Sequence, residues 1–260
     1  MKSRLNKLYS DNRKASARRF EVVAKDDANE VDIFLYDQIV SSEDEAEWWG
    51  GVAPESFVKA VYAVDKQATI NLHVNSPGGS VFAARAMEQA LRAHKGRVVV
   101  HIDGLAASAA TFIAMAGDEV IMAKGAMFMI HKAWTGMWGN AEDLRKEADL
   151  LDKIDGTLAE TYADKTGKDI AAITEWMAAE TWFTAQEALD AGFATSIAEA
   201  EAKAGAWNLS AYDNAPKMDR APTPAPDKAP APEPEPEAMA SADHRDRQQQ
   251  RLRVLSLLNQ

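Results

Sequence analysis

The residues around Ser108 place the strongest constraint on the fold. An apolar run rich in valine, Val98–Ile102, is followed by Gly104 and then by small residues as far as Thr111. This order predicts a buried strand, a tight turn and a closely packed helix. Ser108 is expected near the first turn of that helix, where unpaired backbone N–H groups favour a developing negative charge. Its hydroxyl is therefore a candidate nucleophile, provided that a base reaches it.

A serine among alanines is more often a packing residue whose hydroxyl bonds to its own helix. The catalytic interpretation therefore needs a base elsewhere in the chain. His131 ends an apolar run, Ala126–Ile130, and precedes a glycine-containing loop, so its ring is placed to face a cleft. The alternatives are a hydrogen-bonded histidine at the edge of the core, or a serine–lysine pair that uses Lys124 or Lys132.

A second glycine turn supplies candidate oxyanion donors. Thr69–Val74 is predicted to be a strand, Asn75–Gly79 turns out of it, and Ser80 caps the helix that follows. The N–H groups of Gly79 and Ala109 are then candidates for an oxyanion hole. An ordinary tight turn is the other interpretation. A phosphate-binding loop is disfavoured, because neither GxGxxG nor GxxxxGK[ST] occurs.

Predicted strands alternate with predicted helices, which indicates the α/β class. A long amphipathic helix is expected over 140–166, and Thr184 with Glu187 forms a capping box for a helix that Gly192 ends. The remaining predicted elements are strands at 31–36, 119–122 and 193–197 and helices that begin at Pro54 and Ile170.

Composition narrows the functional class. A net charge of −11 argues against general nucleic-acid binding, and no apolar run is long enough to span a bilayer. The absence of cysteine excludes a cysteine nucleophile and a thiolate zinc site. No metal or cofactor is called for. A cytoplasmic protein is the default expectation.

Four regions are expected along the chain. Residues 1–19 form a basic flexible arm, and residues 20–200 form the folded domain. Residues 201–237 are a proline-rich disordered linker, since eight of the ten prolines lie between Pro216 and Pro236. Residues 238–260 form a short helix-prone tail. Within the domain, Trp48 and Trp49 either anchor a loop or line a groove for an extended peptide.

Residues 31–198 resemble the proteolytic subunit of the Clp protease family, and more closely the related proteases that mature phage heads. The segment Trp49–Val52 leading into Phe57 resembles the phage branch in particular. The residues that carry the family resemblance are Asn75–Gly79, Gly104–Ser108, Met129–His131 and Thr184–Ala188 with Gly192.

The resemblance implies a ββα spiral fold, which the crotonase superfamily shares. It also implies that Ser108 is the nucleophile and His131 the general base, with oxyanion-hole amides from Gly79 and Ala109. Glu180 stands where the family has its catalytic aspartate, and its extra methylene changes the reach of the carboxylate. Asp169, Asp190 and a water molecule are the other candidates for this third role.

By the same resemblance, the protein is expected to be a serine endopeptidase that forms homo-oligomeric rings, with the 140–166 helix at a contact. Its expected substrates are capsid or scaffold proteins, in the host cytoplasm or procapsid, and the linker and tail are plausible tethers to them. Neither a nucleic acid nor a membrane is an expected partner. The need for an unfoldase ATPase stays open. A crotonase-like acyl-CoA enzyme and an inactive protease-fold scaffold are the alternatives.

Overall fold

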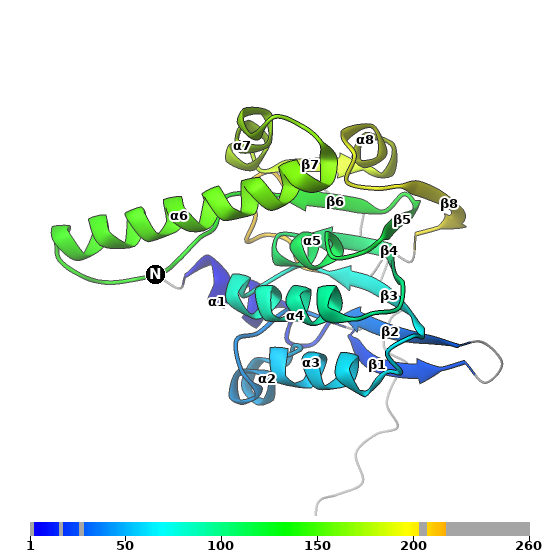
Figure 1. Ribbon diagram of the computed structural model, residues 1–260. Helices are drawn as coiled ribbons and strands as arrows, with labels where there is room; N and C mark the ends of the chain where they lie inside the picture. Colours follow the sequence, from blue (N-terminus) through cyan, green and yellow to red (C-terminus); the bar gives the residue numbers. More distant parts are fainter. Residues whose placement is uncertain (1–2, 16–17, 26–28, 203–206, 217–260) are drawn as a thin grey trace, which may run out of the picture. The chain divides into compact units, whose positions relative to one another are not determined.

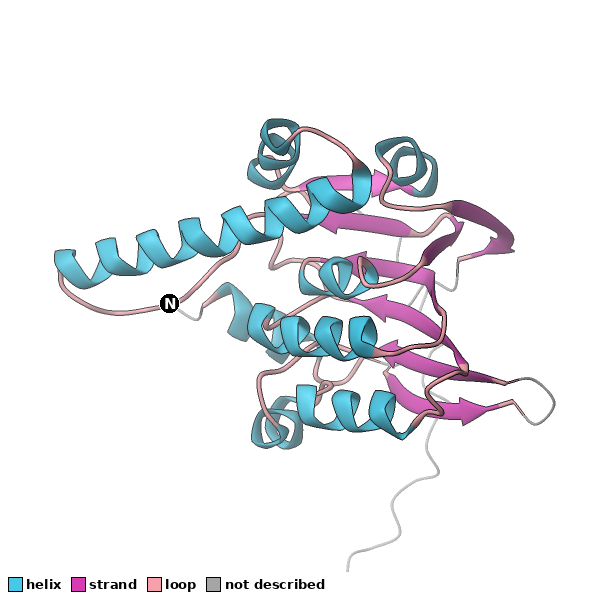
Figure 2. Cartoon of the chain, in the orientation of Figure 1, coloured by secondary structure: helices cyan, strands magenta, loops and turns pink. Residues whose placement is uncertain are grey.

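The computed structural model describes residues 3–15, 18–25, 29–202 and 207–216. In this part of the chain a sheet of eight strands carries helices over one face, with α3, α4 and α5 in front of it in Figure 1 (Figure 2 separates helices from strands by colour). The predicted α/β class is therefore confirmed.

The strands are β1 (Arg19–Ala24), β2 (Glu30–Tyr36), β3 (Thr69–Ser76), β4 (Val98–Ala107), β5 (Glu119–Lys124), β6 (Met127–Ile130), β7 (Thr181–Thr184) and β8 (Ser196–Glu201). The helices are α1 (Arg4–Asn12), α2 (Glu43–Trp49), α3 (Pro54–Ala63), α4 (Val81–Ala93), α5 (Ala109–Ala114), α6 (Ala141–Thr166), α7 (Ile170–Ala178) and α8 (Ala185–Ala191). None of these helices is both long enough and apolar enough to cross a bilayer.

The pairing of the strands brings distant parts of the sequence to one edge. The sheet has the order β1-β2-β3-β4-β5-β8, and β6 pairs with β4 and β7. Strands β3, β4 and β6 are parallel, with Ser76 opposite Ala106 and Ala107 opposite Met129. Their carboxyl ends therefore meet at one edge, which is where open α/β sheets bind ligands.

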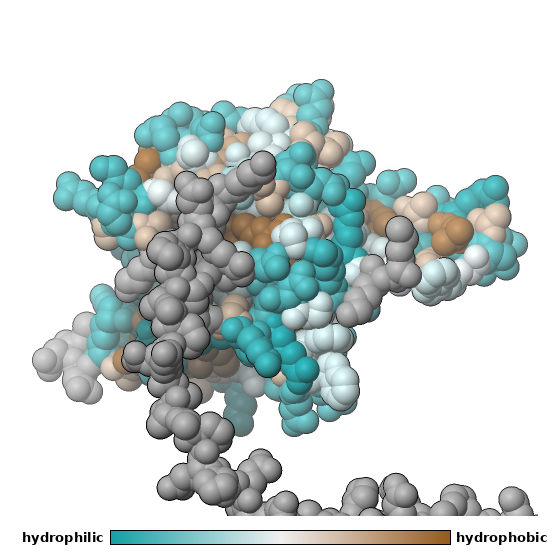
Figure 3. Space-filling view, turned by 180° about the vertical axis from the view of Figure 1, so that it is seen from behind, coloured by the Kyte–Doolittle hydropathy of each residue, from teal (hydrophilic) through white to brown (hydrophobic). Residues whose placement is uncertain are grey.

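One face of the sheet packs beneath the helices. Alternate residues such as Ile33, Leu72 and Val100 are fully buried there, with Phe112 of α5 against them. The opposite face is more polar (Figure 3), and on it the rings of His73 and His101 stack at 4.7 Å between centroids.

Two predicted helices are confirmed with their ends. Asn140 and Asp143 form a capping box at the start of α6, and Gly167 ends the helix in the left-handed conformation. Thr184 and Glu187 form a capping box at the start of α8, and Gly192, with φ 90°, ends that helix. Helix α6 extends well beyond the sheet (Figure 1), and its buried residues are Leu158, Ala159 and Tyr162 near its carboxyl end.

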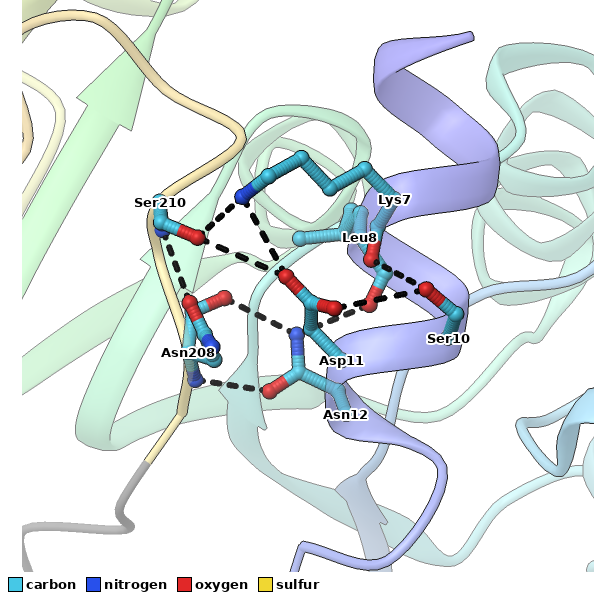
Figure 4. Close-up of polar contacts among 7 residues, drawn as sticks. All are labelled: Lys7, Leu8, Ser10, Asp11, Asn12, Asn208 and Ser210. Carbon is cyan, nitrogen blue, oxygen red and sulfur yellow. Dashed lines mark hydrogen bonds and ion pairs between the residues drawn. The ribbon is translucent and has the colours of Figure 1, made fainter. Parts of the chain in front are cut away.

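The two flanks of the domain differ from the sequence expectation. Within the arm predicted over 1–19, α1 buries Leu8 and Tyr9, because an apolar stripe on a short helix finds a hydrophobic surface to pack on. Residues 207–216 also fold back onto the domain rather than opening a linker. Asn12 and Asn208 exchange hydrogen bonds of 3.0 and 2.7 Å between the two flanks (Figure 4). Most of the proline-rich stretch and all of the 238–260 tail lie outside the described residues.

Two smaller differences concern local structure. Trp48 and Trp49 lie in α2 rather than in a loop. Trp48 is 64% exposed, whereas Trp49 packs against the cluster of Tyr9, Val40 and Ala53. The last strand is Ser196–Glu201 rather than 193–197, because Phe193 turns into the core and is fully buried.

Substitution of Leu8 tests whether α1 belongs to the fold. Leu8 is 1% exposed, so Leu8→Ala is expected to lower the free energy of unfolding by about 2–5 kcal/mol. Asn6→Ala, on the exposed side of the same helix, is the matched control and should change it by less than about 0.5 kcal/mol. Urea unfolding measures both values. Equal stabilities for the two variants would show that α1 is a loose arm.

Candidate active site

The strand-to-helix turn between β4 and α5 holds Ser108 in an uncommon backbone conformation. Ser108 has φ 54° and ψ −127°, which costs a non-glycine residue on the order of 1–3 kcal/mol. The turn is held because the Ser108 N–H donates to the Met129 carbonyl at 2.9 Å and the Ser108 carbonyl accepts from Thr111. A sharp, strained turn of this kind projects a nucleophilic hydroxyl away from the sheet.

His131 directly follows β6, the parallel neighbour of β4. Its Nε2 lies 2.7 Å from the Ser108 Oγ, which is hydrogen-bond distance. The ring packs against Trp134 at 4.7 Å and, edge to face, against Tyr212 at 5.5 Å between centroids. The two residues that the sequence selected 23 positions apart are thus in direct contact.

The surroundings of His131 keep its ring neutral. Burial lowers the pKa of His131 to about 3, and the Arg4 guanidinium acts in the same direction. A hydrogen bond to the backbone of Lys132 raises this pKa by a smaller amount. An imidazole that is neutral at pH 7 and bonded to a hydroxyl is placed to act as a general base.

The backbone amides of Gly79 and Ala109 lie on the two turns that approach each other at Ser108. The N–H groups of Gly79 and Ala109 donate to no acceptor among the residues that the structure describes. A Cβ on Gly78 would lie 2.8 Å from the Ser108 Cβ, so only glycine lets the 75–79 turn approach this closely. This arrangement suits stabilisation of an oxyanion beside Ser108.

A cavity of about 200 Å³ opens onto Gly79, Ser108 and His131. Its walls are mostly apolar, which favours binding of an uncharged, hydrophobic group. The wall residues include Leu5 and Leu8 of α1, Phe82 of α4, Trp134, and Leu151 and Ile154 of α6.

Glu180 lies at the same edge of the sheet, one residue before β7, but it bonds elsewhere. Its carboxylate accepts the N–H groups of Asp213 at 3.1 Å and Asn214 at 2.7 Å, and the indole N–H of Trp182 at 3.3 Å. The positive φ of 48° at Glu180 and its longer side chain suit this direction. Within the described ranges, no hydrogen bond joins Glu180 to His131.

The other candidates for a third catalytic role are engaged too. Asp169 caps α7 by accepting the Ala171 N–H at 2.9 Å, and Asp190 accepts from Gln186 at 2.9 Å. The lysines of the alternative dyad are not bonded to Ser108. Lys132 lies 4.0 Å from Asp155, and Lys124 is exposed at the end of β5.

No group of three or more histidine, aspartate or glutamate side chains that could hold a metal ion occurs in the described part of the chain. The sequence reasoning missed two contributors to the site: α1, whose Leu5 and Leu8 line the cavity, and the segment 207–214. Tyr212 lines the cavity beside His131. The available signal for this segment was the pair of aromatic residues, Trp207 and Tyr212, just before the prolines begin.

Comparison with known proteins adds an independent line of support. The model of the Clp protease family matches residues 28–201. A Clp protease proteolytic subunit 1 of Leifsonia xyli is 34% identical over 139 residues, which cover 53% of this chain and 71% of the relative. A proteolytic subunit 2 of Rhodococcus jostii is 35% identical over 150 residues, or 55% of this chain and 74% of the relative.

A third relative is the ATP-dependent Clp protease proteolytic subunit of Streptococcus agalactiae, which is 36% identical over 141 residues. The match covers 53% of this chain and 72% of that subunit. The family match spans Ser108, His131, Gly79 and Glu180, whereas α1 and Tyr212 lie outside it. This chain belongs to the Clp protease family.

Proposed function

We propose that the chain is a serine endopeptidase of the Clp type, with Ser108 as nucleophile and His131 as general base. The observation that carries this proposal is the 2.7 Å contact between Ser108 Oγ and His131 Nε2, at a strained turn. The Gly79 and Ala109 N–H groups beside it have no acceptor in the described part of the chain. The three relatives are proteolytic subunits by name.

The proposed reaction is acyl transfer in two stages. His131 Nε2 takes the hydroxyl proton while Ser108 Oγ bonds to the peptide carbonyl carbon, and the Gly79 and Ala109 amides hold the oxyanion. The intermediate collapses, the C–N bond breaks, and His131 returns the proton to the leaving amine. Water, activated by the same ring, then hydrolyses the acyl-enzyme and restores the serine.

The narrower proposal, maturation of a phage head, rests on the sequence around Trp49–Val52. The substrates would then be capsid or scaffold proteins. Self-association into rings is proposed with it, supported by the exposed apolar residues Leu144 and Leu150 of α6 and by Trp138 in the loop before it, which is 86% exposed.

Covalent labelling tests the proposed nucleophile. A fluorophosphonate is expected to label the wild-type chain at Ser108, and Ser108→Ala should abolish labelling and lower peptide cleavage by about 10⁴-fold or more. Ser56→Ala, a serine that does not line the cavity, should behave as wild type. Turnover of an acyl-CoA thioester that survives Ser108→Ala would favour the crotonase-like alternative. A folded wild type that resists labelling would favour the inactive scaffold.

The acid limb of the pH profile tests the state of His131. The base works only when deprotonated, and its pKa in the folded protein is lowered from 6.5 to about 3. The labelling rate should therefore stay near its plateau at pH 5, where a histidine with an ordinary pKa would lose about 30-fold. Stopped-time labelling across pH 4.5–8 measures the profile. A midpoint near 6.5 would show that the ring is solvated.

Light scattering and co-assembly test the partner proposals. The purified chain should have the mass of a large oligomer, and a strictly monomeric mass would contradict the rings.

Removal of residues 217–260 should leave cleavage of a short peptide unchanged but reduce incorporation into a head assembly. Equal incorporation of the full and shortened chains would exclude the tether.

A further inference from the structure

Residues 207–214 follow the part of the chain that the family model matches, and they pack close to Ser108 and His131. We call them the flank segment. Trp207, Leu209, Ala211 and Tyr212 are each less than 10% exposed. They form one apolar cluster whose other members include Leu8 of α1, Leu105 of β4 and Met129 of β6. The flank segment is thus part of the folded domain.

Two side chains of the flank segment bond to the turn that presents Gly79. The Trp207 indole N–H donates to Asn75 Oδ1 at 3.0 Å. The Tyr212 hydroxyl donates to the Pro77 carbonyl at 2.5 Å. All four partners are buried. These bonds fix the position of the turn relative to Ser108, and an oxyanion donor works only when it is held in place.

Tyr212 contacts the proposed general base, His131, as well as this turn. Its ring meets the His131 ring at 78° and packs against Trp134 at 5.0 Å and Trp182 at 5.9 Å between centroids. Edge-to-face packing of this kind restricts the orientation of the imidazole and keeps water from it. The buried side chain of Tyr212 therefore contacts both the turn that carries the Gly79 amide and the imidazole of His131.

Bonds at both ends anchor the flank segment. At its carboxyl end, Glu180 accepts the Asp213 and Asn214 N–H groups, and the Asn214 amide donates to the Ala179 carbonyl at 2.9 Å. At its amino end Asn208 is tied to Asn12 of α1 (Figure 4). Arg4 of the same helix forms an ion pair of 2.8 Å with Asp213 at the carboxyl end.

The contacts of the flank segment leave the reacting groups available. The bond between Ser108 and His131 is intact, both residues face the cavity, and the Gly79 and Ala109 amides are unbonded among the described residues. The turn carbonyl and amide oxygen that accept from Tyr212 and Trp207 take no part in acyl transfer. The Tyr212 hydroxyl also lies beside the Ser108 side chain: burial raises the pKa of Tyr212, and a hydrogen bond to Ser108 lowers it by a smaller amount. This pattern fits support of the site rather than obstruction.

We propose that Tyr212 is a positioning residue for the reaction at Ser108, and that Glu180 serves the reaction by anchoring the segment that carries Tyr212. This inference rests on the proposed peptidase function. It assigns the orientation of His131 to aromatic packing, in place of a carboxylate.

Tyr212→Phe in the full-length chain tests the hydroxyl while keeping the ring. Loss of its bond to Pro77 should lower kcat for a short peptide ester about tenfold, the equivalent of one hydrogen bond, with little change in KM. The pH profile should be unchanged, because the ring still covers His131. Tyr62→Phe, at a tyrosine of α3 that is 67% exposed, is the matched control and should equal wild type. Tyr212→Ala should also move the acid limb upward toward pH 6.5.

Glu180→Gln, alone and combined with Tyr212→Phe, tests the anchor. Because both changes act through the flank segment, the double variant should lose less activity than the product of the two single losses. If Glu180 oriented the imidazole directly, Glu180→Gln alone would lower kcat by about 10⁴-fold, as the equivalent change does in a serine protease triad, and the two losses would multiply.

Three outcomes would overturn the proposal: Tyr212→Phe equal to wild type, Tyr212→Phe faster than wild type, or fully multiplicative losses. A faster variant would show that the flank segment obstructs the site. Thermal unfolding confirms that each variant folds, and the isosteric Tyr212→Phe decides the case if Tyr212→Ala does not. Absence of labelling at Ser108 in the wild type would instead refute the peptidase function itself.

Discussion

The parallel pairing of β3, β4 and β6 is the constraint on which the site depends. Each strand ends at the same edge, and each is followed at once by one component: residues 77–79 of the glycine turn, Ser108, and His131. The bond from the Ser108 N–H to the Met129 carbonyl ties the last turn of one strand to its neighbour. A slip of one residue in this register would turn every side chain to the other face and separate the hydroxyl from the imidazole.

Close packing around Ser108 keeps its backbone in the strained conformation. The residues behind it, Ala106, Ala107 and Ala110, are small and almost fully buried, so the backbone has no room to relax. Beyond this family core, the site draws on two segments that the family match does not include, α1 and residues 207–214. They fill the space beside His131 with apolar and aromatic groups, and this burial sets the low pKa of the ring.

Local signals in the sequence predicted what depends on local chemistry. The cap of α8, the extent of α6, the turn before Ser80, and the positions of Ser108 and His131 at element ends all follow from local patterns in the sequence. What the sequence could not predict depends on long-range docking. The apolar stripe of α1 consists of only three residues, Leu5, Leu8 and Tyr9, so its burial depends on a surface formed elsewhere. Trp207 and Tyr212 carry no periodicity, and the direction of the Glu180 carboxylate depends on backbone amides more than thirty residues away.

The central claim is that one oxygen beside Ser108 is held by two backbone amides. A crystal structure of the covalent fluorophosphonate adduct measures this most directly. The account predicts a phosphonyl oxygen about 2.7–3.1 Å from both the Gly79 and the Ala109 nitrogen, with His131 still beside Ser108 Oγ. An adduct whose oxygen points to solvent, away from both amides, would contradict it.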